Sequence, residues 1–327
     1  MAWDFGDRMT DAILIESFQR LLADAAPVSD LRAVKTGLLA CWAKIEASGY
    51  LDALLPEALG GAGLSLDEIE PLVCAMGAGL LPAPVAETMV ARLWSAQAGV
   101  PIAPGMAVVL APASAMIPLA GHATHALVPR GERFDLVSLG PSAADPFHAG
   151  AGVVAETCPV IGSIPAGDID LLAAAAAFLS ARMAGTMSKV LAMSIGYANT
   201  REQFGRPLGK FQTIQHNLAI MAEEVLSARS ASRIGLAGPS FDALRSAAAK
   251  ARVSEAAQII CSLAHAVHGA IGVTSEHDLH LYTTRLMEGR IAFGSERYWG
   301  RRLGASRLDE RSGTSADFIR DKLQNSR

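Results

Sequence analysis

The most informative residues lie in a charged turn between two helical segments, where the sequence reads YANTREQFGRPLGKFQ from Tyr197 to Gln212. Arg201 carries a planar guanidinium, a group that binds phosphate oxygens through two parallel hydrogen bonds. Phe204 and Gln212 add an aromatic ring and an amide to the same turn. A structural interpretation is also open, in which Arg201 decorates an exposed helix end and Phe204 fills the core.

The turn lies between long predicted helices. The segment before it is rich in alanine and contains no proline, and Asp168 and Asp170 stand where they can cap its first turn. A second helix begins at about Phe211. Residues 167–327 are therefore predicted to form a helical bundle, with helices over 168–199, 212–234 and 240–268.

Residues 1–104 are also predicted to be helical. Apolar residues recur at helical spacing in Met9–Ala23 and in Leu31–Ser48, so each segment has one apolar face. Ser65, with Glu68 three residues later, has the pattern of a capping box at the start of another helix.

The middle of the chain, residues 105–166, has a different pattern. Short apolar runs at Ala107–Leu110 and His125–Val128 alternate with glycine, proline and polar residues, which predicts strands and turns. Repeated prolines disfavour long helices here. The span is long enough for a small sheet but short for a closed barrel.

Composition narrows the class of protein. The 327 residues are 51% hydrophobic and 18% charged, values typical of a compact soluble protein. A net charge of −4 with no basic tract argues against nucleic-acid binding. No signal peptide or membrane-spanning run is evident, so we expect a cytoplasmic protein with no membrane partner. The four cysteines are widely spaced, which favours free thiols over disulfides or a zinc site.

Three blocks of the sequence resemble the acyl-CoA dehydrogenase family, flavoproteins that desaturate acyl-CoA thioesters between the α and β carbons. The turn at Arg201–Gln212 carries the likeness most strongly. The glycine-rich loop Gly49–Gly63 and the segment His268–Tyr282 are similar to two further family motifs. The resemblance implies a mainly α fold with an N-terminal helical domain (1–104), a reduced middle β domain (105–166) and a C-terminal four-helix bundle (167–327).

The resemblance also implies FAD as cofactor and roles for four residues. By this likeness Arg201 binds the pyrophosphate, Phe204 packs on the adenosine, and Gln212 supplies an amide contact. The backbone around Gly269 lies near the same cofactor, although Gly269 and Gly272 also suit a tight left-handed turn. Family members use these residues on the FAD of the adjacent subunit. We therefore expect the chain to oligomerise, with acyl-CoA as substrate and electron-transfer flavoprotein as a further partner.

The catalytic base of the family is absent from its expected positions. The reaction needs a carboxylate that removes the α proton of the thioester in a dry pocket. In many family members it is the first residue of a Glu-Gly-Thr-Ser-like run, and here the corresponding run is Phe293-Gly294-Ser295-Glu296. Phenylalanine cannot accept a proton. Other members place the base on the first bundle helix, where this chain has the alanines of 173–177.

The middle domain lacks a second family feature. Residues 106–165 contain no tryptophan and nothing like the Trp-Ile-Thr-Asn strand that covers the flavin ring in full-length members. The absent parts are those that a subunit uses on its own flavin and substrate, and the retained parts reach a neighbour's FAD. We therefore expect a subunit that completes the site of a homologous chain, similar to the heteromeric α2β2 acyl-CoA dehydrogenases of bacterial steroid and side-chain degradation.

Two alternatives stay open. A self-sufficient homo-oligomeric dehydrogenase would use Glu288 or Glu296 as its base, although both lie among arginines and are interpreted as solvated charges. A non-enzymatic scaffold would keep the bundle and lose flavin. Four histidines occur between His265 and His280, but no further ligands accompany them, and no metal site is predicted.

Overall fold

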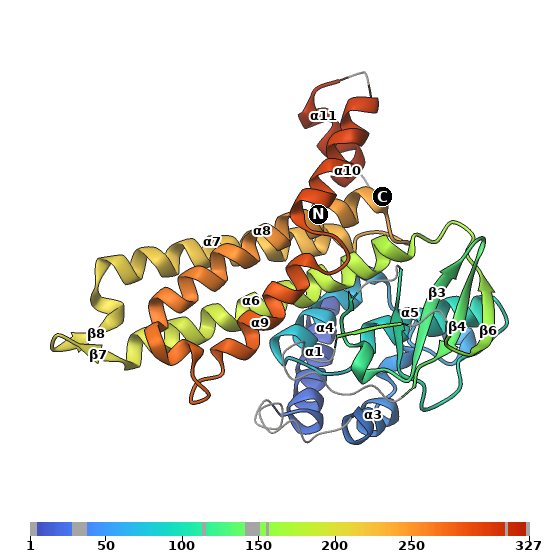
Figure 1. The fold of residues 1–327 in the computed structure, drawn as a ribbon, viewed down its shortest axis with the longest axis horizontal. Helices are drawn as coiled ribbons and strands as arrows, with labels where there is room; N and C mark the ends of the chain where they lie inside the picture. The colour runs from blue at the N-terminus through green and yellow to red at the C-terminus, as the bar shows by residue number, and fades with distance from the viewer. Residues whose placement is uncertain are drawn as a thin grey trace.

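The computed structural model describes residues 5–27, 38–112, 116–140, 151–154, 157–310 and 313–324. Figure 1 shows the long C-terminal helices running across the molecule, the shorter N-terminal helices packed below them in this view, and a small sheet at one end. The predicted order of helices, strands and helices is confirmed, and so is the mainly α fold. The domain boundaries at 104 and 166 stay predictions.

The capping box predicted before the third described helix is confirmed. Ser65 Oγ accepts a hydrogen bond from the Glu68 amide at 3.3 Å, and Glu68 Oε2 accepts one from the Ser65 amide at 2.7 Å. Of the helix predicted over 31–48, residues 38–47 are helical, and 31–37 lie outside the described residues. The described helices of this part are α1 (Phe5–Ala25), α3 (Leu38–Ala47), α4 (Leu66–Ala78) and α5 (Val85–Gln97), with short turns η1 (Tyr50–Asp52) and η2 (Glu57–Leu59).

The middle part is a small open sheet. Its strands follow the order β1-β3-β4-β6, with β1 and β3 parallel and the other neighbours antiparallel. Both strands expected from the apolar runs are confirmed. The strands are β1 (Val108–Leu110), β3 (His125–Arg130), β4 (Arg133–Ser138) and β6 (Val160–Pro165), and a separate pair joins β2 (Met116–Ile117) to β5 (Gly152–Val153).

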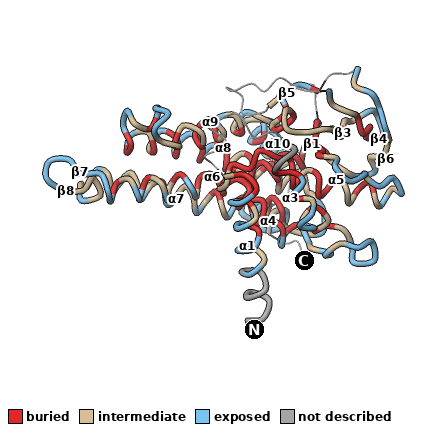
Figure 2. Tube along the Cα trace, turned by 90° about the horizontal axis from the view of Figure 1, so that it is seen from below, coloured by how far each residue is buried: buried red, intermediate tan, exposed pale blue. Residues whose placement is uncertain are grey.

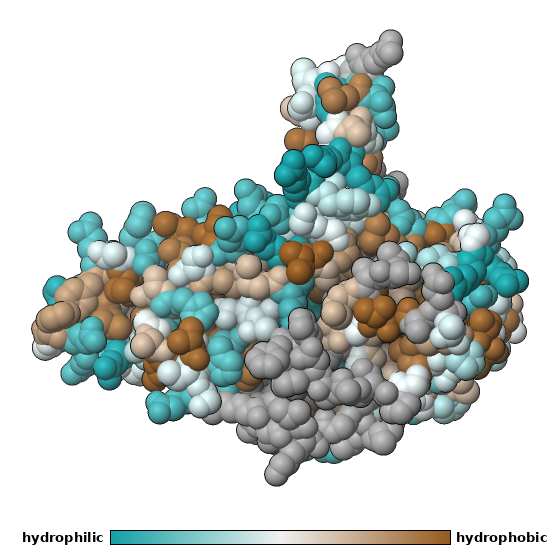
Figure 3. All heavy atoms as spheres, in the orientation of Figure 1, coloured by the Kyte–Doolittle hydropathy of each residue, from teal (hydrophilic) through white to brown (hydrophobic). Residues whose placement is uncertain are grey.

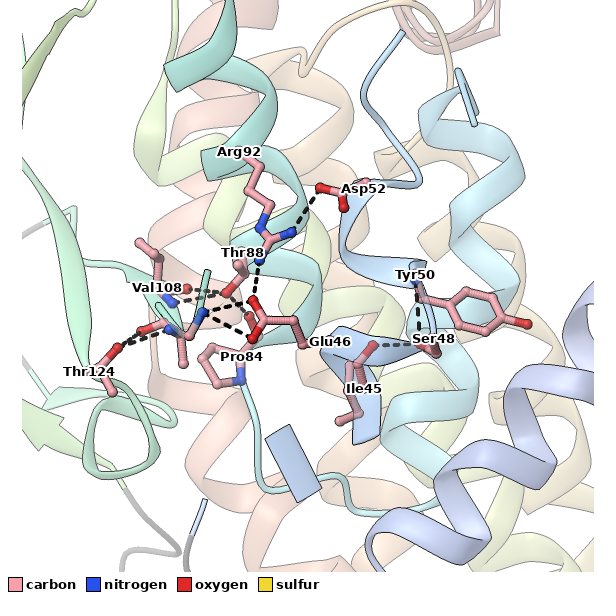
Figure 4. Close-up of polar contacts among 12 residues, drawn as sticks. Ile45, Glu46, Ser48, Tyr50, Asp52, Pro84, Thr88, Arg92, Val108 and Thr124 are labelled. Atoms are coloured by element: carbon pink, nitrogen blue, oxygen red, sulfur yellow. Dashed lines mark hydrogen bonds and ion pairs between the residues drawn. The ribbon is translucent and has the colours of Figure 1, made fainter. Parts of the chain in front are cut away.

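Helix α5 ties the N-terminal helices to the sheet (Figure 4). The guanidinium of Arg92 contacts Glu46 Oε1 of α3 and Asp52 Oδ1 of η1, each at 2.8 Å. One turn earlier, Thr88 Oγ1 accepts a hydrogen bond from the amide of Val108 in β1 at 2.9 Å. These contacts fix the first strand of the sheet against the helical layer.

Helix α6 (Leu171–Thr200) is the axis of the C-terminal part, and it packs against α4 and the three helices that follow it. Asp170 Oδ1 accepts a hydrogen bond from the Ala173 amide at 2.9 Å, so the predicted cap is confirmed. Figure 2 shows much of α6 buried among its neighbours. The following helices are α7 (Gln212–Gly235), α8 (Ala243–His268), α9 (Leu279–Ile291) and α10 (Glu296–Asp309).

Where the helices α4 and α6 cross, their backbones lie in direct contact. A Cβ atom added to Gly77 of α4 would lie 1.8 Å from the carbonyl oxygen of Arg182, and one added to Gly185 of α6 would lie 1.8 Å from that of Cys74. No side chain fits at either position, because real Cβ atoms do not approach other heavy atoms so closely. The two glycines therefore let α6 lie directly on the N-terminal helices.

Helix α10 and the short α11 (Ser315–Ile319) stand away from the rest of the molecule (Figure 1). Hydrophilic residues gather on this projection near its base (Figure 3). Arg297 and Arg301 are exposed there, whereas Trp299 on the same helix is fully buried. The helix is therefore anchored by one face and solvated on the other.

Two helical segments, Leu171–Thr200 and Ala243–Val273, are long and apolar enough to cross a membrane by length and composition. In the fold, 83% of the apolar window of the first and 44% of that of the second are buried. Burial inside a packed bundle is what such a composition produces in core helices.

Replacing Gly185 with Ala should lower the free energy of unfolding by at least about 2 kcal/mol, because the added methyl group overlaps the backbone of α4. Gly196→Ala is the matched control on the same helix, since nothing lies within 4 Å of its Cβ position. That control should stabilise the protein by about 0.5–1 kcal/mol through helix propensity. Denaturant unfolding of both variants would measure the difference, and equal stability would contradict the close helix crossing.

Candidate active site and oligomer contact

A cavity of about 450 Å³ lies where α4, α6 and α9 meet the strand β2. This volume is within the range of about 300–1,000 Å³ that accommodates small-molecule ligands. Its walls are mainly apolar, so an acyl or ring system would gain free energy by leaving water for it. The apolar lining includes Met76, Leu80, Ile117, Leu179, Met183 and Phe293.

Three charged residues interrupt this apolar lining. Arg182 of α6 is held by Glu87 of α5, with 3.1 Å between Nη2 and Oε2, and it donates to the Leu81 carbonyl at 3.3 Å. Arg285 and Glu288 of α9 lie one turn apart, with 4.0 Å between Nη1 and Oε2. Burial lowers the pKa of Arg285 to about 10, and the nearby Arg182 adds to this while Glu288 opposes it. Arg285 therefore remains charged at neutral pH.

Phe293 lies in the wall of the cavity, at the position where the resemblance led us to expect the base. It packs against three separate clusters of buried apolar residues, so it belongs to the junction between the sheet and the bundle. Its backbone has a φ of 55°, and its carbonyl accepts a hydrogen bond from Trp299 Nε1 at 2.9 Å. An aromatic side chain in this place gives the cavity shape and no proton acceptor.

The two weaker candidates for the base have different surroundings. Glu296 is paired with Arg290, with hydrogen bonds of 2.5 and 3.2 Å, and it is not among the residues lining the cavity. The hydrogen bond from Arg290 holds the pKa of Glu296 below its usual range. Glu288 lines the cavity, and only 23% of its side chain is exposed. The interpretation of Glu288 as a solvated charge was wrong, because α9 turns this side chain inward.

The alternative base position on α6 contains no carboxylate. The alanines of 173–177 are all 2% exposed or less, and they form the contact surface of α6 with its neighbours. The charged residue that α6 does bring to the cavity is Arg182, which the sequence reasoning missed. A single arginine within the apolar run FLSARMAGTM was the available signal.

The four residues predicted to contact a cofactor lie at the far end of the bundle. Arg201 ends α6, and the short strands β7 (Glu202–Gln203) and β8 (Arg206–Pro207) form a hairpin beyond it (Figure 1). The 15 residues from Thr186 in the cavity wall to Arg201 span roughly 22 Å of helix. The predicted cofactor contacts and the cavity are therefore two separate places in this chain.

The hairpin presents its side chains to solvent. Phe204 is 91% exposed, so the interpretation of this residue as part of the core was wrong. Its φ of 53° is a left-handed conformation that a bulky residue rarely adopts. Phe211 packs beside it at 6.2 Å between ring centroids, and the guanidinium of Arg206 lies 4.1 Å from the Phe211 ring. Arg201 and Gln212 are exposed as well.

Gly269 lies at the same end of the bundle, directly after helix α8. It follows α8 with a φ of 64°, and it is exposed. The rings of Tyr197 and His268 stack at 4.6 Å between centroids, which brings the ends of α6 and α8 together. His277 packs against His268 at 4.7 Å. Among the described residues no group of three or more His, Cys, Asp and Glu is placed to hold a metal.

The chain matches known proteins over most of its length. The family described as "Acyl-CoA dehydrogenase, C-terminal domain" matches residues 169–307. Acyl-CoA dehydrogenase IpdE2 of Mycobacterium tuberculosis is 31% identical over 259 residues, covering 73% of this chain and 77% of that protein. The IpdE2 of Mycolicibacterium smegmatis is 28% identical over 270 residues, covering 80% of this chain and 85% of that protein.

Solved structures agree with these sequence matches. The Tcur3481–Tcur3483 steroid ACAD G363A variant superposes with a TM-score of 0.77 at 25% identity, covering 92% of this chain and 98% of that chain. The ChsE4–ChsE5 complex from Mycobacterium tuberculosis superposes with a TM-score of 0.76 at 21% identity, covering 93% and 98%. The chain belongs to the acyl-CoA dehydrogenase family, oxidoreductases that act on acyl-CoA thioesters.

Glu87→Ala should destabilise the cavity wall, because it removes the carboxylate partner of the mostly buried Arg182 guanidinium. We expect a loss of about 2–3 kcal/mol in the free energy of unfolding, at the low end for a buried pair because both side chains keep some solvent exposure. Glu16→Ala removes the partner of Arg20 in an exposed pair and should change stability by less than about 1 kcal/mol. Similar losses in the two variants would show that the Arg182–Glu87 pair is effectively solvated.

Proposed function

We propose that this chain is a subunit of a heteromeric, FAD-dependent acyl-CoA dehydrogenase that desaturates a CoA thioester. It lacks its own catalytic base and completes the FAD site of a homologous partner chain that carries one. The observation that carries this proposal is Phe293 in the cavity wall, at the position expected for the base. Proton abstraction in the complex belongs to the partner chain.

The chemistry of the cavity supports this division. A general base must come within hydrogen-bond reach of the α carbon's proton and must be free to accept it. Among the described lining residues the one carboxylate is Glu288, which lies 4.0 Å from the guanidinium of Arg285. This carboxylate is therefore engaged in an ion pair within α9. The apolar wall suits the binding of an acyl group better than its deprotonation.

The exposed tip of the bundle, which consists of the β7–β8 hairpin with Arg201, Gln212 and Gly269 beside it, supports a role in a neighbour's cofactor site. FAD, when bound, accepts the hydride that leaves the β carbon of the thioester. The guanidinium of Arg201 suits its pyrophosphate, the ring of Phe204 its adenosine, and the amide of Gln212 a further polar contact. The backbone of Gly269 lies at the same end of the bundle. A phenylalanine that is 91% exposed and backbone-strained fits a surface that meets another molecule.

The comparisons support the partner and the substrate class. One similar structure is titled a complex of two named chains, ChsE4 and ChsE5, and the other a steroid ACAD named for two chains. We therefore propose a heteromer that acts on the CoA thioester of a bulky acyl group, with electron-transfer flavoprotein as electron acceptor.

Arg201→Ala should reduce FAD retention by the assembled complex. Loss of charge-assisted hydrogen bonds to a phosphate costs about 1.5–3 kcal/mol, which corresponds to roughly 10- to 100-fold weaker binding. Flavin absorbance after gel filtration, titrated against added FAD, measures the change. Arg233→Ala is the control, because this arginine is exposed on α7 far along the helix from the tip.

The isolated chain supplies the wider test of the proposal. Purified alone, it should hold little FAD and show no turnover, and co-expression with its partner should restore both flavin colour and activity. Full FAD occupancy with turnover in the isolated homomer would overturn the proposal. A co-purified complex without flavin absorbance would favour the non-enzymatic scaffold instead.

The second candidate is a self-sufficient homo-oligomer in which Glu288 is the base, and the position of Glu288 in the cavity wall is the observation that favours it. In that enzyme Glu288→Gln should lower kcat by about 100- to 10,000-fold, the usual contribution of a general base. Glu296→Gln, in the ion pair with Arg290, serves as the control for a carboxylate outside the cavity. Undiminished turnover of Glu288→Gln would exclude Glu288 as the base.

A further inference from the structure

The corner between α9 and α10, residues 291–295, carries two consecutive residues with left-handed backbone. Phe293 has a φ of 55° and Gly294 a φ of 98°. A bulky residue persists in this conformation only where its surroundings fix it. Gly294 is required here, since a Cβ atom would lie 2.5 Å from Tyr298 Cδ1. The position of Phe293 in the cavity wall therefore depends on what holds this corner.

Two buried side chains hold it by hydrogen bonds to three backbone carbonyls between Arg290 and Gly294. Lys250 Nζ of α8 donates to the carbonyls of Arg290 at 3.1 Å and of Gly294 at 2.9 Å, on either side of Phe293. Trp299 Nε1 of α10 donates to the carbonyl of Phe293 itself at 2.9 Å. Lys250 and Trp299 are both 0% exposed.

A lysine ammonium suits this place for two physical reasons. Arg290 lies in the last turn of α9, where carbonyls have no partner along the helix and favour a positive charge. The ammonium has three donors, and its third hydrogen bond goes to Ser254 Oγ at 2.8 Å. The charged neighbours are Glu296 at the start of α10, which attracts it, and Arg290 at the end of α9, which repels it.

We infer that Lys250 is a positioning residue that fixes the Phe293 corner, and with it one wall of the cavity, from outside the cavity. Lys250 is not among the residues that line the cavity, so it acts through the backbone of 290–294. The inference concerns this chain's own wall and does not depend on which chain supplies the base or on FAD binding.

Opening of this corner brings Lys250 into water, and the opening is therefore linked to proton uptake by Lys250. Burial lowers the pKa of Lys250 to about 7, with Glu296 opposing this shift and Arg290 adding to it. In the opened corner the pKa returns to the ordinary lysine value of about 10.4. Above pH 7 the closed corner therefore holds Lys250 as a neutral amine, whose two N–H donors still match the carbonyls of Arg290 and Gly294. The open form stays protonated, so it binds more protons than the closed form across this window, and opening becomes rarer as pH rises, by up to about tenfold per pH unit.

Hydrogen–deuterium exchange of the backbone amides tests the inference. In Lys250→Met, exchange of residues 291–295 should accelerate at least about tenfold, while α4 and α7 keep their protection. Lys189→Met is the matched control, because Lys189 is an exposed helical lysine on α6. Unchanged exchange at the corner in Lys250→Met, or an equal loss of protection across all helices, would overturn the inference.

A second measurement needs no variant and so remains decisive if Lys250→Met fails to fold. Pulsed exchange of the unmodified protein between pH 7 and 9.5, corrected for the intrinsic chemical rate, should show protection of 291–295 rising with pH by up to about tenfold per unit. Protection of α4 should rise less steeply, since its local openings do not hydrate Lys250. A flat profile at the corner would overturn the role assigned to Lys250.

Discussion

The backbone contact between α4 and α6 is the constraint on which the rest of this structure depends. Gly77 and Gly185 allow the two helices to touch, and no larger residue fits at either place. The contact sets the distance between α6 and the N-terminal helices. It thereby sets where Arg182 and Met183 enter the cavity and where Arg201 emerges at the other end. One helix thus contributes both to the cavity and to the exposed tip.

The cavity has a defined wall in which Phe293 stands at the position expected for the base. Two buried side chains, Lys250 and Trp299, bind the backbone on both sides of Phe293, and Gly294 adopts a conformation that few other residues tolerate. These contacts hold a strained corner in a defined place. A wall without function would be expected to relax such strain, because left-handed conformations of bulky residues cost free energy. The corner therefore gives this side of the cavity a defined shape.

The cavity and the exposed tip are separate places on this chain. Roughly 22 Å of helix lies between Thr186 and Arg201. The tip exposes a guanidinium and an aromatic ring, whereas the cavity buries apolar groups and paired charges. Exposed aromatic surface is poorly solvated, and contact with another chain or its cofactor would remove it from water. This arrangement supports the proposal that the tip contacts a neighbouring chain.

The sequence by itself determined the features that depend on residues close together along the chain. Helical periodicity and the caps at Ser65 and Asp170 act within one turn, so they were predictable, and the motif from Arg201 to Gln212 was sufficient to indicate the family. Only the tertiary structure decided that Glu288 faces the cavity, that Phe204 is exposed, and that Lys250 is buried against a corner 40 residues away. A side chain's environment is set by the elements that pack against it from distant parts of the chain, and that information is not present in local spacing.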